Sequence, residues 1–143
     1  MLSDMGAEVV KLEPPEGDVT RGWGKMQAGL SGYYTQQNSG KRSISIDLDA
    51  PGSTKLVRRL AAKADIVIEN FGTGVMERFG LGSDELRREN PGLVYISASG
   101  LGRTGPEAKA VAYGTLLQCY AGFAGLNRHA DICLLYTSDA ADE

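Results

Sequence analysis

Asp65-Ile66-Val67-Ile68-Glu69 is a short apolar run with a charged residue at each end, and Asn70-Phe71-Gly72 follows it directly. Its β-branched centre predicts a strand. Because the apolar residues are consecutive rather than alternating, the pattern is typical of a parallel sheet that is covered on both faces.

Helical patterns flank this strand. Upstream, Asp49 can cap a helix and Pro51 sits near its first turn. Downstream, short helices are predicted over residues 75–79 and 83–89, the second with Ser83 as its cap. In the upstream helix, apolar residues recur at helical spacing at Leu56, Leu60, Ala61 and Ala64.

Further strands lie outside these helices. Residues 7–13 predict a strand that ends at Pro14-Pro15, and residues 93–98 predict another buried strand. Residues 113–126 predict a final helix. Strands that alternate with helices indicate an α/β fold with a mostly parallel sheet and flanking helices. Residues 42–48 alternate as a half-buried strand does, with one face formed by Ile44, Ile46 and Leu48.

The segment from residue 16 to residue 40 is rich in glycine and polar residues, and it predicts a long loop. A loop of this length in a compact domain is usually functional. Three aromatic residues could anchor it, namely Trp23, Tyr33 and Tyr34.

The composition excludes several classes of protein. The chain has 143 residues, 42% of them hydrophobic and 23% charged, which is typical of one globular domain. It contains no apolar run of the ~18 residues that span a bilayer and no secretory leader, so we expect no membrane partner and a cytoplasmic location. The net charge is −3 and the basic residues are scattered, so we expect no nucleic-acid partner.

The sequence offers no metal site and no acid–base constellation. Cys119 and Cys133 lack metal-ligand spacing, and His129 is the single histidine. A catalytic triad needs a carboxylate and a nucleophile paired with its histidine, and the sequence pairs neither with His129. Neither the dinucleotide-binding fingerprint nor the P-loop is present.

Both ends of the chain are unusual. Residues 133–143 resemble the translated adapter of transposase-based sequencing libraries, and we interpret them as an artefact. They contain three acidic residues and no basic ones, so the other residues carry 15 acidic and 15 basic side chains. The first strand begins abruptly, and a parallel sheet normally has an earlier strand and crossover, so we expect an upstream segment and a fold that is incomplete at both ends.

The tips of the predicted strands are the candidate ligand site, because parallel sheets bind ligands beyond their carboxyl ends. Phe71 offers stacking to a nucleobase, although a buried core position is the more common use of such a residue. Lys41 and Arg42 could meet an anion, as could Arg21 and Arg78, but solvated positions are also typical. Residues 100–105 could approach a phosphate or form a plain turn.

Seven segments carry a family resemblance. They are residues 2–15 (LSDMGAEVVKLEPP), 17–21 (GDVTR), 38–44 (NSGKRSI), 64–71 (ADIVIENF), 74–81 (GVMERFGL), 90–100 (NPGLVYISASG) and 105–106 (GP). In this order and spacing they resemble the family III CoA-transferases, also called the CaiB/BaiF family, over residues 1–127. The resemblance implies a partial N-terminal CoA-binding domain over residues 1–132, with a Rossmann-like body that forms an interlocked homodimer.

The resemblance also implies a substrate and a site. The substrates would be an acyl-CoA and a carboxylic acid, with coenzyme A as substrate rather than as a permanently bound cofactor. Tyr113 would lie near the active site, and an aspartate about thirty residues later would be the nucleophile. Asp131 is too early, and Asp142 lies in the suspected artefact, so we assign no catalytic residue and expect this fragment to be inactive. The residues expected to contact CoA are Ile46, Asp47, Leu48, Asp49, Asn70, Phe71, Gly72 and Arg78.

Two alternatives stay open. The α-methylacyl-CoA racemases share the body but place a histidine just before the tyrosine matched by Tyr113, where this chain has Val111 and Ala112. That difference favours a transferase. The chain could also be a noncatalytic CoA-binding module.

Overall fold

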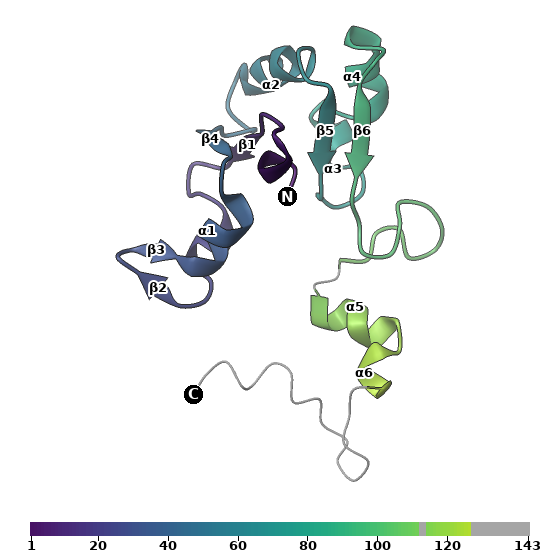
Figure 1. The fold of residues 1–143 in the computed structure, drawn as a ribbon. Helices are drawn as coiled ribbons and strands as arrows, with labels where there is room; N and C mark the ends of the chain where they lie inside the picture. The colour runs from purple at the N-terminus through teal and green to yellow at the C-terminus, as the bar shows by residue number, and fades with distance from the viewer. Residues whose placement is uncertain (112–113, 127–143) are drawn as a thin grey trace. The chain divides into compact units, whose positions relative to one another are not determined.

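The computed structural model describes residues 1–111 and 114–126 (Figure 1). This part of the chain is mixed α/β, as the sequence predicts, and its strands form three two-stranded sheets. Two of these sheets are parallel and one is antiparallel. The chain divides into two compact units, called here unit 1 (Met1–Leu60) and unit 2, which begins at Ala61.

Unit 1 is built on a parallel strand pair. Strand β1 (Val10–Glu13) pairs with β4 (Arg42–Ser45), so that Val10 lies beside Arg42 and Glu13 beside Ser45. Strand β1 begins three residues later than predicted because its partner begins only at Arg42. The residues before it include a short 3-10 helix, η1 (Ser3–Met5).

The two faces of this pair differ in polarity. Glu13 is buried on one face, and Lys11 is half-buried on the same face. On the other face Val10 is 42% exposed and Leu12 is 39% exposed. The alternation predicted for residues 42–48 is confirmed, because Ile46 is buried while its neighbours Ser45 and Asp47 are exposed. The regular strand, however, ends at Ser45.

Residues 16–40 are not a long loop, and that prediction was wrong. They form a 3-10 helix, η2 (Val19–Gly22), a hairpin of β2 (Met26–Gln27) and β3 (Leu30–Ser31), and helix α1 (Gly32–Asn38). Helix α1 has no apolar stripe to reveal it and is started by the Ser31 hydroxyl, which accepts from the Tyr34 N–H at 3.0 Å. The hairpin turns at Ala28 and Gly29, with φ of 51° and 78°, as a tight two-residue turn requires.

Unit 2 contains the second parallel pair. Strand β5 (Ile66–Glu69) pairs with β6 (Val94–Ser97), with Ile66 beside Val94 and Glu69 beside Ser97. Both predicted strands are therefore confirmed. The expectation that β5 is covered on both faces is wrong for the described residues, because the apolar face is exposed by 45% at Ile66 and 55% at Ile68.

The helices of both units differ from prediction in detail. Helix α2 (Ser53–Ala61) runs across the boundary between the units and buries Val57 and Ala61, whereas Leu56 is exposed rather than inward-facing. It begins at Ser53, so Asp49 and Pro51 lie before it.

The next helices, α3 (Val75–Arg78) and α4 (Ser83–Glu89), confirm two predictions. Ser83 is nevertheless the first residue of α4 rather than its cap, a position that Gly82 occupies. The apolar core of unit 2 contains Met76, Leu81, Leu86 and Leu93.

The predicted final helix is divided into α5 (Gly114–Tyr120) and α6 (Phe123–Leu126). Gly122 lies between them with φ of 75°, a left-handed conformation that ends a helix. Tyr113 lies outside the described residues, as do His129 and Cys133. Among the described residues, no helix has both the length and the apolar character needed to span a bilayer.

Candidate functional site

A buried glutamate ends one strand of each parallel pair. Glu13, the last residue of β1, is 3% exposed, and Glu69, the last residue of β5, is 7% exposed. A buried carboxylate is costly unless charged and polar donors surround it. Each of these glutamates is surrounded by such donors at the carboxyl end of a parallel pair, where α/β proteins bind ligands.

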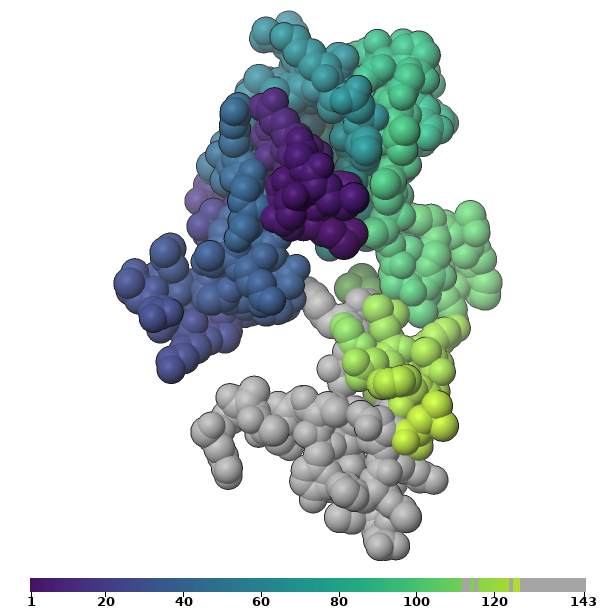
Figure 2. Space-filling model, in the orientation of Figure 1, coloured from purple at the N-terminus to yellow at the C-terminus, as the bar shows by residue number. Residues whose placement is uncertain are grey.

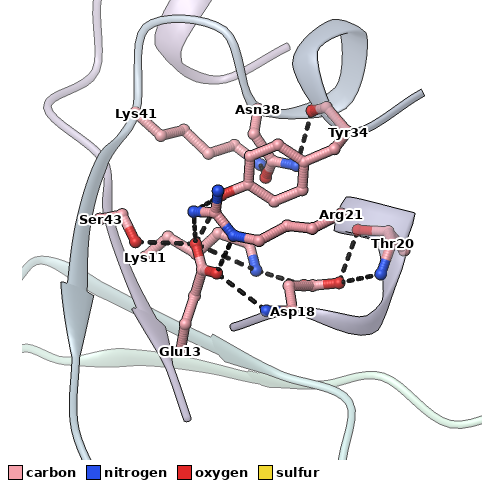
Figure 3. A network of polar contacts seen from close by, with 9 residues as sticks. All are labelled: Lys11, Glu13, Asp18, Thr20, Arg21, Tyr34, Asn38, Lys41 and Ser43. Carbon is pink, nitrogen blue, oxygen red and sulfur yellow. Dashed lines mark hydrogen bonds and ion pairs between the residues drawn. The ribbon is translucent and has the colours of Figure 1, made fainter. Parts of the chain in front are cut away.

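Glu13 is held by donors from several elements of unit 1 (Figure 3). The Arg21 Nε donates to Oε2 at 2.7 Å and its Nη2 donates to Oε1 at 3.0 Å. The Tyr34 hydroxyl and the Ser43 hydroxyl donate to Oε1 at 2.5 and 2.7 Å. The Asp18 backbone N–H donates to Oε2 at 2.9 Å. We call these five residues the Glu13 cluster.

The arginine and tyrosine of the Glu13 cluster also contact each other. The Arg21 guanidinium carbon lies 4.1 Å from the centre of the Tyr34 ring, and its Nη2 donates to the Tyr34 hydroxyl at 2.7 Å. Burial raises the pKa of Tyr34, as does the hydrogen bond to Glu13. The phenol therefore stays protonated and serves as a donor to the carboxylate.

Asp18 extends the cluster toward strand β1. Its carboxylate accepts from Lys11 Nζ and, at 2.8 Å, from the Thr20 N–H. Burial alone would raise the pKa of Asp18, but the bonds from Lys11 and Thr20 outweigh it and lower the pKa to about 2. The hydrogen bond from Arg21 is the main cause of a pKa of Glu13 well below its usual range.

We predict that stability falls in acid because of these two carboxyls. Their folded pKa values lie below the ordinary values of 4.5 and 3.8, so the unfolded chain binds more protons as pH drops through that range. The stabilisation is complete above about pH 5 and is lost progressively toward about pH 2. Urea unfolding of the full protein at a series of pH values measures this, and Glu13→Gln should flatten the dependence. An equal slope in Glu13→Gln would contradict the prediction.

The Glu69 cluster repeats this pattern in unit 2. Arg103 Nη2 donates to Oε1 at 2.7 Å and to Oε2 at 2.9 Å, the Ser97 hydroxyl donates to Oε1, and the Phe71 N–H donates to Oε2 at 2.8 Å. The cluster is thus Glu69, Phe71, Ser97 and Arg103. In both clusters a serine of the neighbouring strand and an arginine of a later segment bind the carboxylate.

Tyr95 lies on the same face of β6 as Ser97. Its hydroxyl is buried and has no hydrogen-bond partner among the described residues, which also holds for Arg103 Nε. Burial, followed by the negative charges of Glu69 and Glu77, raises the pKa of Tyr95 to about 12. The phenol is therefore neutral at physiological pH.

The structure places the predicted site residues in two separate groups, one in each unit. In unit 1, Ile46 is buried and its N–H donates to the Glu13 carbonyl at 2.8 Å, while Leu48 is half-buried. Asp47 and Asp49 are exposed, and the Asp47 carboxylate accepts from the Asp49 N–H at 2.9 Å.

In unit 2, Asn70, Phe71 and Gly72 follow β5 directly, and Phe71 is 45% exposed. The core interpretation of Phe71 is therefore wrong. Arg78 is also exposed, with its guanidinium carbon 4.9 Å from the centre of the Phe79 ring. Tyr113 is not placed.

Both glutamate clusters escaped the sequence analysis. Arg21 was expected in solvent or against an anionic ligand, but its partner is Glu13. Residues 100–105 were considered as a turn or a phosphate loop, but Arg103 from this segment binds Glu69. The sequence offered little sign of the Glu13 cluster, because Glu13 shares its face of β1 with Lys11 while the apolar Val10 and Leu12 lie on the other face.

The parallel strand pairs and the helices between their strands define an α/β protein. Comparison with known proteins identifies the family. The sequence profile of CoA-transferase family III matches residues 1–132, and the chain belongs to this family.

Its relatives include the succinate–glutarate CoA-transferase of Agrobacterium fabrum, 43% identical over 92% of this chain and 35% of that protein. The acetyl-CoA:oxalate CoA-transferase of Acetobacter aceti is 42% identical over 85% of this chain and 32% of that protein. A crystal structure of a CaiB/BaiF family protein from Brucella suis matches with a TM-score of 0.85 and 42% identity, covering 92% of this chain and 36% of that one. The chain thus spans about a third of the length of these relatives.

Proposed function

We propose that the full protein transfers coenzyme A from an acyl-CoA to a carboxylic acid. Family membership supports the class of reaction, and both relatives described above are CoA-transferases by name. The observation that carries the proposal in this chain is the exposed Phe71 ring at the carboxyl end of β5, with its backbone held by Glu69. An aromatic face in that position suits the adenine of CoA.

The other proposed contacts follow from charge and exposure. Arg78, exposed at the end of α3 and seven residues after Phe71, is suited to a phosphate of CoA. Asn70 can donate to and accept from the adenine edge through its amide. In unit 1, the carboxylates of Asp47 and Asp49 suit amino or hydroxyl donors of the nucleotide rather than its phosphates. Ile46 is buried, so we propose that it and Leu48 support this segment.

The proposed reaction proceeds through an aspartyl intermediate. The carboxylate attacks the thioester carbonyl, the carbon–sulfur bond breaks, and a mixed anhydride and CoA thiolate form. The thiolate then attacks the aspartyl carbonyl and releases the donor acid, leaving an aspartyl-CoA thioester. The acceptor carboxylate repeats these steps in reverse order. We assign the nucleophile to an aspartate about thirty residues after Tyr113, with Tyr113 beside it, and propose that residues 1–132 alone are inactive.

We further propose that the full protein works as an interlocked homodimer in the cytoplasm and retains no permanently bound cofactor. Size-exclusion chromatography with light scattering tests the dimer. A monomer that keeps full activity would exclude it.

Phe71→Ala tests the placement of CoA. Stacking of a base on an aromatic ring contributes about 1–3 kcal/mol, so we expect the dissociation constant of CoA in the full protein to rise roughly tenfold or more. Isothermal titration calorimetry measures it. Phe123→Ala is the matched control, because Phe123 is 53% exposed on α6 and outside the proposed site. Equal affinities for Phe71→Ala and the unsubstituted protein would exclude Phe71 from the adenine site.

A further inference from the structure

A single buried carboxylate connects two segments that are distant in sequence. The Glu69 Oε2 accepts from the Phe71 N–H at 2.8 Å, and Nη2 of Arg103 contacts both carboxylate oxygens at 2.7 and 2.9 Å. Arg103 belongs to the segment of residues 98–111 that follows β6, called here the 98–111 loop. Much of this loop lies at the surface of unit 2 (green in Figure 2). Glu69 therefore ties this loop to the backbone beside Phe71.

Two further hydrogen bonds join the same segments. The Ala98 N–H donates to the Glu69 carbonyl at 2.8 Å, and the Thr73 hydroxyl donates to the Ala108 carbonyl. Glu69 is thus bound to Ala98 and Arg103 of the 98–111 loop, and Thr73, four residues later, is bound to Ala108 of the same loop. Of these contacts, the one between Glu69 and Arg103 joins two charged groups, and hydrogen bonds between charged groups are stronger than neutral ones.

Phe71 depends on these ties for its position. Phe71 is 45% exposed, so it is not enclosed by the core. Gly72 follows it, and Gly74 two residues later has φ of 86°. Glycines allow the backbone many conformations, so the hydrogen bond from the Phe71 N–H to Glu69 restricts a segment that would otherwise be free to move.

We propose that Glu69 and Arg103 are positioning residues for CoA, which hold Phe71 and the 98–111 loop in the arrangement that receives the nucleotide end. The inference rests on the proposed function, in which Phe71 meets the adenine. A site that is ordered before binding avoids the entropy cost of ordering it during binding. Neither residue acts on the thioester, so their loss affects binding and KM rather than kcat.

Arg103→Met in the full protein is the first test, with three measurements. We expect the dissociation constant of CoA to rise roughly tenfold, the KM for acyl-CoA to rise in parallel and kcat to stay within about twofold. In the absence of CoA, the amides of residues 70–74 should exchange hydrogen faster than in the unsubstituted protein. Arg88→Met on α4 is the matched control, because Arg88 is exposed and outside this cluster.

Two more variants test the same contact. Arg103→Lys retains the charge but not the geometry of the guanidinium, so we expect an intermediate affinity, and this variant replaces Arg103→Met if the latter does not fold. Glu69→Gln combined with Arg103→Met should weaken binding by less than the product of the two single effects, because both remove one contact.

The outcomes separate the inference from the proposed function. If the unsubstituted protein does not bind CoA, both are overturned. If Phe71→Ala weakens binding but Arg103→Met and Arg103→Lys bind CoA normally, with normal exchange at residues 70–74, only the inference is overturned. A fall in kcat without a change in KM would also overturn it, because the two residues would then act on the reaction rather than on binding.

Discussion

Glu13→Ala is expected to lower the free energy of unfolding of the full protein by about 3 kcal/mol, the lower part of the range for breaking a buried ion pair. The side chain of Glu13 is only 2% exposed, whereas that of Arg21 is 43% exposed and can be rehydrated when its partner is lost. The main cost falls on the other donors. The Asp18 N–H and the hydroxyls of Tyr34 and Ser43 would all lose their acceptor.

Glu8→Ala is the matched control for this prediction. Glu8 also pairs with an arginine, Arg42, at 2.8 Å, but the two side chains are 69% and 77% exposed. An exposed pair of this kind contributes about 0–1 kcal/mol. Urea unfolding followed by circular dichroism measures both variants. Similar losses in Glu8→Ala and Glu13→Ala would show that burial of the Glu13 cluster does not stabilise the protein.

Leu86→Ala is expected to destabilise the protein by a similar amount, about 2–5 kcal/mol, through a different cause. Leu86 is 2% exposed on α4, and its removal leaves a cavity as well as losing buried apolar surface. Leu56→Ala on α2 makes the same chemical change at a residue that is 44% exposed, and it should cost less than about 1 kcal/mol.

Chemical denaturation measures this pair as well. Because leucine and alanine have similar helix propensities, the difference between the two variants reports burial rather than helix formation. If Leu56→Ala cost as much as Leu86→Ala, the inward face of α2 would be the one predicted from sequence rather than the one described above.

The two strands of unit 2 were predicted well because each is an apolar run, whereas helix α4 contains a single apolar residue, Leu86. Strands β5 and β6 and helices α3 and α4 were all expected within a residue or two of their bounds. Helix α1 was missed because Gly32–Asn38 is polar and aromatic, and its start depends on a hydrogen bond that the Ser31 hydroxyl accepts from the Tyr34 N–H. The break at Gly122 depends on a backbone angle that the apolar pattern does not encode.

The sequence predicted a candidate site at the strand ends, but it did not predict which side chains contact one another there. The strand tips were identified from the direction of parallel strands, and the exposed Phe71 lies on one of them. The partners of Glu13 and Glu69 were not identified, because Arg21 comes from a 3-10 helix of only four residues and Arg103 from an irregular segment, and neither shows a sequence period. Pairing between a strand residue and a distant loop is a tertiary property, and local patterns carry little information about it.

The register of the two parallel pairs has a consequence for folding. Val10 pairs with Arg42 and Ile66 pairs with Val94, so each ladder closes a loop of about thirty residues. The entropy lost on closing a loop grows only with the logarithm of its length, so the two closures cost nearly the same. Each unit contains its own crossover from strand to strand, and neither ladder requires the other to close first. We therefore expect the two ladders to form independently of each other, at a similar entropic cost.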